Sequence, residues 1–196
     1  MASTYNKQRV YLVRHGETQW SMSGRHTGST DIPLTDHGRK AAERLAPALR
    51  QHSFDLVLVS PLQRAIETCA LAGFADYAST DANLREWDYG SYEGKTPQEI
   101  RALDPDWLLF RDGGPGGESP KQIRNRVDRV IAKVQGFRGN VALFAHGHIL
   151  RVLGARWIGL PVEDGSRFRL DTATLSVLSY YHGIPAIERW NDAIDR

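Results

Sequence analysis

The sequence lacks the features that mark secreted and membrane-spanning proteins. A single cysteine, Cys69, among 196 residues excludes an internal disulfide and suits a reducing compartment. No apolar run is long enough to cross a bilayer, and the opening residues MASTYNKQR lack the apolar core of a signal peptide. We therefore expect a soluble, cytoplasmic protein with no membrane partner.

An excess of charge of either sign is also missing. The chain carries 25 Lys and Arg against 23 Asp and Glu, a formal net charge of +2. Such a balance gives no reason to expect nucleic acid as a partner, and any positive field must be local. Internal repeats and low-complexity linkers are absent as well. Since 196 residues suit one domain with a sizeable core, we expect a single domain over residues 1–196.

Short runs rich in β-branched and aromatic residues predict five strands. Three of them are continuous apolar runs, as in strands covered on both faces: 9–13, 56–60 and 140–145. The other two, 175–181 and 185–190, flank the tripeptide HGI and predict a terminal hairpin. The outer strand of that hairpin offers an edge for a homodimer.

Helix starts are signalled by three segments of one pattern. SPLQ (60–63), TPQE (96–99) and SPKQ (119–122) each offer a hydroxyl N-cap, a proline at the first helical position and Gln or Glu at the third. They predict helices from about residues 61, 97 and 120, and further helices begin near Thr35 and after His146. Alternating strands and helices predict a three-layer α/β/α sandwich with a mostly parallel central sheet.

Cationic side chains follow three of the predicted strands. Arg14 and His15 end the first, Arg64 lies in the first turn after the second, and His146 and Gly147 follow the third. Ligands of such sheets bind beyond the carboxyl ends of the strands, where helix N-termini also point. We therefore expect a compact cationic pocket for a small oxyanion, and phosphate fits best.

These residue types suit phosphoryl transfer. Arginines neutralise the phosphoryl oxygens, and nearby positive charge keeps His15 neutral, with a lone pair free to attack phosphorus. A general acid must protonate the departing alkoxide. Glu86 in NLREWDYGSYEG is our candidate, with Asp88 and Glu93 as alternatives.

Five blocks in order resemble the histidine phosphatase superfamily, which includes the cofactor-dependent phosphoglycerate mutases. They are LVRHGET (12–18), SPLQRAIET (60–68), LREWDYGSYEG (84–94), GGES (116–119) and AHGHILRVL (145–153). The resemblance covers nearly the whole chain and implies a phosphoglycerate mutase-like fold. It also implies a phosphohistidine on His15, a phosphate pocket from Arg14, Arg64 and His146, and Glu86 as the acid, with no metal or other cofactor.

The segment SMSGRHTGSTDIPLT (21–35) resembles the phosphate and substrate loop of that family, and most of all its sugar-phosphate phosphatases. Thr27 and the backbone of Gly28 match phosphate-contacting positions, and Gly147 adjoins His146. Ser21 stands where the mutases usually carry Asn. His26 either touches substrate or lies in a solvated loop.

Hydrolysis is favoured over mutase activity. A mutase must enclose its carboxylated substrate, yet the stretch from Glu86 to Ser119 is short, with only Lys95, Arg101 and Arg111 as basic residues. We expect a metal-independent phosphomonoester hydrolase acting on a small-molecule phosphate ester, a sugar phosphate or similar. A phosphoglycerate mutase and a non-catalytic phospho-ligand binding module are the alternatives.

A metal-dependent hydrolase is a further alternative, since His146 and His148 form an H-x-H pair. The predicted helix begins almost at once after the strand, and residues two apart on a helix do not share a face. We therefore expect His148 to be structural and bonded to backbone.

Overall fold

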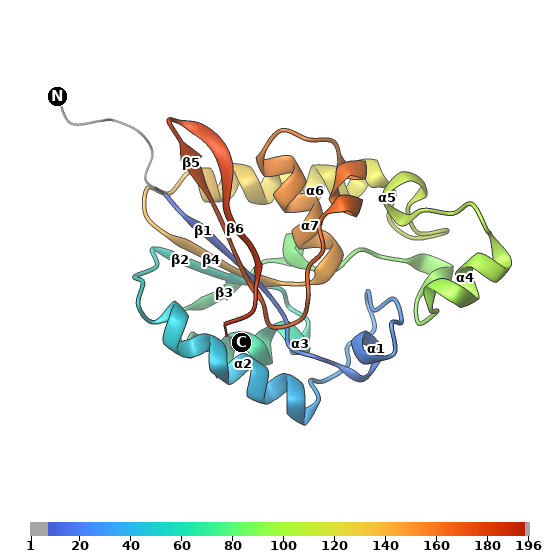
Figure 1. The fold of residues 1–196 in the computed structure, drawn as a ribbon, viewed down its shortest axis with the longest axis horizontal. Helices are drawn as coiled ribbons and strands as arrows, with labels where there is room; N and C mark the ends of the chain where they lie inside the picture. Colours follow the sequence, from blue (N-terminus) through green and yellow to red (C-terminus); the bar gives the residue numbers. More distant parts are fainter. Residues whose placement is uncertain (1–7, 195–196) are drawn as a thin grey trace.

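The central sheet has six strands in the order β3-β2-β4-β1-β5-β6 (Figure 1). The computed structural model describes residues 8–194, so most of the N-terminal segment used above to argue against a signal peptide lies outside the described residues. The first four strands in this order are parallel, whereas β5 and β6 run antiparallel to their neighbours. The strands are β1 Val10–Arg14, β2 Leu56–Val59, β3 Ala78–Thr80, β4 Val141–Ala145, β5 Leu175–Tyr181 and β6 Ile184–Asp192.

Helices cover both faces of the sheet. α2 (Asp36–Leu49) and α3 (Gln63–Leu71) lie on one face, and α6 (Pro120–Gln135) and α7 (Gly147–Trp157) lie on the other (Figure 1). This arrangement confirms the α/β/α sandwich. The shorter elements are α1 Gln19–Met22, α4 Pro97–Leu103, α5 Leu109–Asp112 and the 3₁₀ turns η1 Ala82–Leu84, η2 Gly90–Tyr92 and η3 Val162–Arg167.

Alternation along β1 divides the core in two. Val10 and Leu12 pack into the cluster beneath α6 and α7, whereas Tyr11 and Val13 pack into the cluster beneath α2 and α3. The apolar run is thus buried on both faces, and each fully buried side chain of this kind contributes about 1.5–3 kcal/mol. Anchored in this way, β1 carries Arg14 and His15 to a fixed place at its carboxyl end.

Four of the predicted helix starts are confirmed, three of them with side-chain caps. Thr96 and Ser119 form capping boxes with Glu99 and Gln122, Thr35 caps α2, and α7 follows His146 directly.

The start of α3 was predicted wrongly. Ser60 does not cap this helix, which begins at Gln63, two residues later than expected. The backbone N–H of Gln63 donates instead to Asp31, at 2.8 Å, and the Ser60 hydroxyl contacts the ring of His146 at 2.7 Å. Asp31, 32 residues away along the chain, thus accepts the N–H at the start of α3 in place of the expected cap Ser60.

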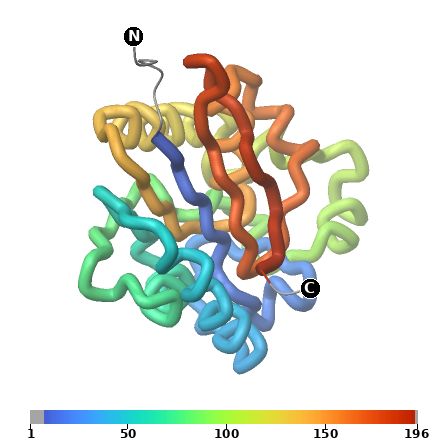
Figure 2. The backbone as a smooth tube through the Cα atoms, turned by 60° about the vertical axis from the view of Figure 1, so that its left-hand side comes forward, coloured from blue at the N-terminus to red at the C-terminus, as the bar shows by residue number. Residues whose placement is uncertain are grey.

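The terminal hairpin is present and forms one edge of the sheet, next to β1 (Figure 2). The three-residue strand β3, with two exposed positions, was not predicted from the sequence. None of the helices in the described part of the chain is long and apolar enough to span a membrane.

Candidate active site

The cationic residues converge at the carboxyl ends of β1, β2 and β4. The register pairs Arg14 of β1 with Ala145 of β4, so the next residues, His15 and His146, lie side by side with ring centroids 5.1 Å apart. From the helix after β2, Nε of Arg64 reaches Nδ1 of His146 at 3.1 Å. The structure thus brings together residues that are up to 132 positions apart, as the strand-end argument predicts.

His15 is buried and oriented by its own neighbour. Its Nδ1 lies 2.7 Å from the carbonyl oxygen of Gly16. Because a carbonyl only accepts, the ring proton is on Nδ1 and the lone pair is on Nε2. Burial first, and then the charges of Arg64 and Arg14, hold the pKa of His15 well below its ordinary value of 6.5. His15 is therefore a neutral imidazole with a nucleophilic nitrogen.

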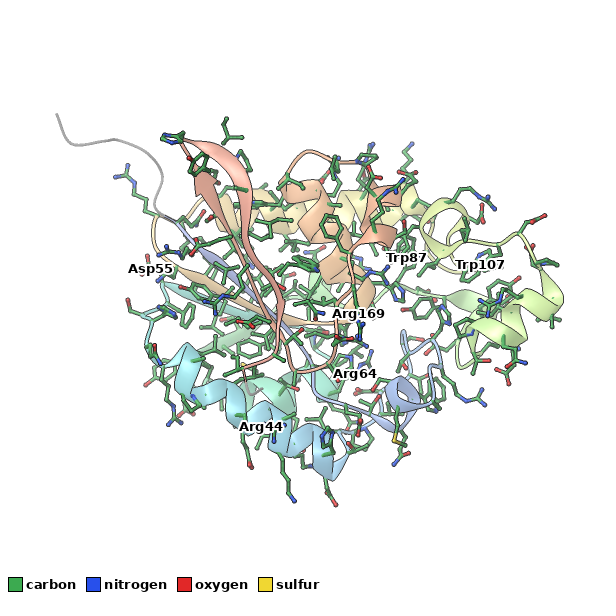
Figure 3. The ribbon with its side chains drawn as sticks, viewed as in Figure 1. Arg44, Asp55, Arg64, Trp87, Trp107 and Arg169 are labelled. Atoms are coloured by element: carbon green, nitrogen blue, oxygen red, sulfur yellow. The ribbon has the colours of Figure 1, made fainter. Side chains whose placement is uncertain are left out.

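Arg64, labelled in Figure 3, is a buried cation whose guanidinium donates to backbone carbonyl groups. Its Nη atoms donate to the carbonyl oxygens of Thr27, Gly28 and Thr30 at 2.9–3.1 Å. Its Nε donates to His146, which leaves the proton of that imidazole on Nε2, facing the Ser60 hydroxyl. Arg64 therefore joins the 27–30 loop to His146 and supplies positive charge from directly behind the site.

Arg14 has a donor without a protein partner. Its Nη1 bonds the carbonyl oxygen of Leu170, whereas its buried Nε has no hydrogen-bond partner among the described residues. An unpaired buried donor is costly, so this nitrogen points to a functional role for Arg14. Gly147 lets the α7 backbone approach: a Cβ there would lie 3.3 Å from the Arg14 guanidinium.

A cavity of about 210 Å³ lies in front of these residues. Besides Arg14 and His15, four predicted site residues line it: Ser21, Thr27, Glu86 and Gly147. Arg64 and His146 are fully buried behind its wall. The lining residues are Arg14, His15, Ser21, Gly24, Arg25, His26, Thr27, Glu86, Tyr89, Pro97, Gly147, His148, Arg151 and Leu170. Three arginines and one carboxylate give this cavity the local positive field expected for an oxyanion site.

Glu86 is the only one of the three acid candidates that lines this cavity. Its Oε1 accepts from the N–H groups of Trp87 and Ile149, and its Oε2 accepts from that of His148, each at 2.9 Å. Burial alone would raise the pKa of this carboxyl, but the contacts with His148 outweigh it and hold the pKa well below 4.5. Glu86 thus meets the N-terminus of α7 as a carboxylate.

Asp88 and Glu93 have other roles. Asp88 is exposed and accepts the N–H of Gly90. Glu93 accepts the N–H groups of Gly28 and Thr30 at 2.9–3.1 Å and so fixes the loop from its other side. The N–H of Gly28 therefore points to Glu93. Gly28 does not line the 210 Å³ cavity but an adjacent one.

The two hydroxyl residues of the predicted substrate loop lie on the cavity wall. Ser21 belongs to the capping box of α1 with Thr18, and Thr27 donates to the carbonyl oxygen of Arg25 at 3.1 Å. Each hydroxyl keeps acceptor capacity toward the cavity.

His26 and His148 also line the cavity. The expectation that His148 bonds to backbone through its ring was wrong: its Nδ1 lies 2.6 Å from the Tyr89 hydroxyl. The ring of His26 lies in the cavity wall and not in a solvated loop. The H-x-H spacing drew attention to His148, but no sequence signal connects it with His26 or Tyr89.

The metal-pair alternative finds no support in the geometry. Both ring nitrogens of His146 are engaged, one by Arg64 and one by Ser60. Within residues 8–194, no group of three or more His, Cys, Asp or Glu side chains is arranged to hold a metal ion.

Comparisons with known proteins agree with this geometry. Residues 10–193 match the model of the histidine phosphatase superfamily (branch 1). The chain is 43% identical to an acid phosphatase of Mycobacterium tuberculosis, covering 90% of this chain and 88% of that protein. It is 36% identical to sedoheptulose 1,7-bisphosphatase of Saccharomyces cerevisiae, covering 79% and 69%.

Among solved structures, that of the open reading frame Rv3214 product of Mycobacterium tuberculosis superimposes with a TM-score of 0.91. It is 39% identical, and the match covers 95% of this chain and 98% of that one. The family match spans almost every described residue and includes both strand ends that carry the paired histidines. This chain belongs to the histidine phosphatase superfamily.

Proposed function

We propose that this chain hydrolyses phosphate monoesters through a phosphohistidine on Nε2 of His15. The observation that carries the proposal is that the neutral, oriented imidazole of His15 and the guanidinium of Arg14 line the same cavity. The imidazole supplies the nucleophile, and the guanidinium donates hydrogen bonds to the bound anion. Family membership together with the phosphatases among the relatives supports a phosphoric monoester hydrolase.

The reaction has two displacement steps. Nε2 of His15 attacks phosphorus, the P–O bond to the alcohol breaks, and Glu86 gives its proton to the departing oxygen. Water then attacks the phosphohistidine, Glu86 takes a proton from that water, and the P–N bond breaks to release phosphate. Arg14, with Arg64 and His146 behind it, offsets the charge on the phosphoryl oxygens.

Glu86 must be protonated for the first step, although it is a carboxylate in the empty site. A phosphate group in the cavity brings negative charge beside it and raises the pKa of the carboxyl. A substrate that arrives as the monoanion supplies the proton.

Hydrolysis of sugar phosphates or similar small metabolites is favoured over mutase activity. Neither Lys95, Arg101 nor Arg111 lines the cavity, so the 87–119 segment brings no cation to a substrate carboxylate. The acid phosphatase and the sedoheptulose bisphosphatase among the relatives support the same choice. We place the enzyme in the cytoplasm, with the open edge of β6 as the surface for a homodimer.

Trapping the intermediate tests this proposal. The protein is mixed with a ³²P-labelled ester and quenched in alkaline detergent, which preserves phosphohistidine. We expect acid-labile label on the wild type and on His37→Asn, an exposed-histidine control, and none on His15→Asn. Turnover without trapped label, or label on His15→Asn, would contradict it. A mutase would interconvert phosphoglycerate isomers with little release of phosphate.

A further inference from the structure

Two imidazoles in the cavity wall do not act on the reacting atoms in the steps described above, although Nδ1 of one of them, His148, lies 3.7 Å from Oε2 of Glu86. The rings of His26 and His148 are parallel to within 4°, with centroids 5.9 Å apart. Tyr89 packs edge-on against both, at 4.8 and 5.7 Å, and Trp107 packs against His26 at 5.8 Å. These contacts fix the two rings as one rigid wall beside Glu86.

The partner of His148 determines where its ring proton lies. The Tyr89 hydroxyl is buried, and in the described part of the chain its hydrogen-bond partner is Nδ1 of His148 at 2.6 Å. Burial raises the pKa of Tyr89 well above 10, so the phenol keeps its proton and must donate it. Nδ1 therefore accepts, and the ring proton of His148 is on Nε2.

His26 has the opposite arrangement. Its Nδ1 lies 3.1 Å from the carbonyl oxygen of Lys95, which only accepts, so Nδ1 carries the proton and Nε2 carries the lone pair. Among residues 8–194, no hydrogen bond to a protein atom is found for Nε2 of either ring. Burial lowers the pKa of His26 and lowers that of His148 to about 4, so both rings are neutral near pH 7.

The wall therefore presents one N–H donor and one lone pair to the same cavity. An alcohol hydroxyl is both a donor and an acceptor, and so it matches this pair. A carboxylate or a second phosphate only accepts, and it would meet the lone pair of His26 unfavourably.

We propose that His26 and His148 form a specificity site for hydroxyl groups on the alcohol part of the substrate, which selects sugar or polyol phosphates. A substrate hydroxyl accepts from Nε2–H of His148, and the same or a neighbouring hydroxyl donates to Nε2 of His26. The inference rests on the proposed function, because it requires the ester to lie in this cavity with its leaving oxygen near Glu86.

A pair of esters of similar size tests the site. Glycerol 1-phosphate and n-propyl phosphate share a three-carbon primary alcohol, and only the first carries further hydroxyls. The readout is the ratio of their kcat/KM values, so a general loss of activity cancels. We expect the wild type to favour glycerol 1-phosphate about tenfold, as two hydrogen bonds allow.

Two substitutions of His148 distinguish the role of its Nε2 from that of its Nδ1. The amide of His148→Gln reaches the place of Nε2 and can still donate there, whereas the amide of His148→Asn reaches only the place of Nδ1. We expect His148→Asn to lower the ratio about three- to fivefold and His148→Gln to restore most of it. Equal ratios in the two variants, or a wild type without preference, would overturn the proposal.

Independent variants keep the test decisive if His148 cannot be replaced without unfolding. His26→Asn keeps a donor for the carbonyl of Lys95 but removes the acceptor at the place of Nε2. Tyr89→Phe keeps the packed ring but removes the hydroxyl that holds the proton of His148 on Nε2. Both should lower the ratio, and an unchanged ratio in both would overturn the proposal. Failure of the proposed function looks different: no ester, including p-nitrophenyl phosphate, would leave label on His15.

Discussion

Nε of Arg64 donates to Nδ1 of His146 across 3.1 Å, and this contact connects the helix after β2 with the end of β4. It sets the imidazole proton of His146 on Nε2. The same guanidinium holds three carbonyl oxygens of the 27–30 loop. One buried side chain thus fixes both a tautomer and a loop.

Replacing Arg64 should therefore affect both activity and stability. Arg64→Lys keeps the charge but lacks the fork that reaches three carbonyls and His146. We expect kcat/KM to fall about a hundredfold, and the free energy of unfolding to fall by about 2–4 kcal/mol. Urea denaturation and steady-state kinetics measure the two effects. Arg39→Lys, at a partly exposed ion pair with Glu67, is the control and should change neither appreciably.

The loss of kcat caused by replacing Glu86 should depend on the leaving group of the ester. Glu86→Gln removes the acidic proton, so we expect kcat for alkyl phosphates to fall about a hundredfold or more. The loss for p-nitrophenyl phosphate should be at least tenfold smaller, since that alcohol departs without protonation. Asp88→Asn, at an exposed carboxylate outside the 210 Å³ cavity, is the matched control. Equal losses on both esters would remove Glu86 from the acid role.

Acidification should destabilise the fold through its buried imidazoles. Burial lowers the pKa of His15, His146 and His148 in the folded protein. Above pH 6.5 both states are neutral at these groups, and below it the unfolded chain binds protons that the folded chain does not. The free energy of unfolding should therefore fall as the pH drops from 7 to 5.

For His148, whose folded pKa is about 4, the expected loss over that range is about 1–2 kcal/mol. Denaturant titrations at pH 7, 6 and 5 measure it. The slope should be shallower in His148→Gln than in the wild type and unchanged in His37→Asn, whose side chain is 71% exposed. A wild-type stability that is constant from pH 7 to 5 would show that these imidazoles titrate normally.

Gly28 should tolerate no side chain. A Cβ there would lie 2.6 Å from Oε2 of Glu93 and 2.6 Å from the carbonyl oxygen of Trp87. We expect Gly28→Ala to displace the loop and lower kcat/KM at least tenfold. Gly136→Ala, at the end of α6 where the closest atom would be 3.2 Å away, should retain wild-type kinetics. Wild-type activity in Gly28→Ala would show that the loop position is not critical.

Local signals in the sequence predicted much of this architecture. The apolar runs before Arg14 and His146 and the hydroxyl caps at Thr96 and Ser119 act over a few residues, and each formed as expected. Strand ends then placed the cationic groups together, because parallel strands share one carboxyl edge.

The remaining features depend on partners far along the chain. Asp31 caps α3 in place of Ser60, because the Ser60 hydroxyl faces His146, 86 residues away. Likewise, the ring of His148 is oriented by Tyr89, 59 residues earlier. Hydrogen bonds of this kind are set by tertiary packing, and no local pattern encodes them.

The position of β1 in the sheet has a consequence for biosynthesis. Of the six described strands this one is synthesised first, and it pairs with β4 and β5, whose residues begin at 141 and 175. Residues 141–181 must therefore be synthesised before β1 gains both neighbours and His15 reaches its final environment. We expect chains that terminate before β5 to be catalytically silent, so that phosphatase activity reports on molecules in which β1 has both neighbours.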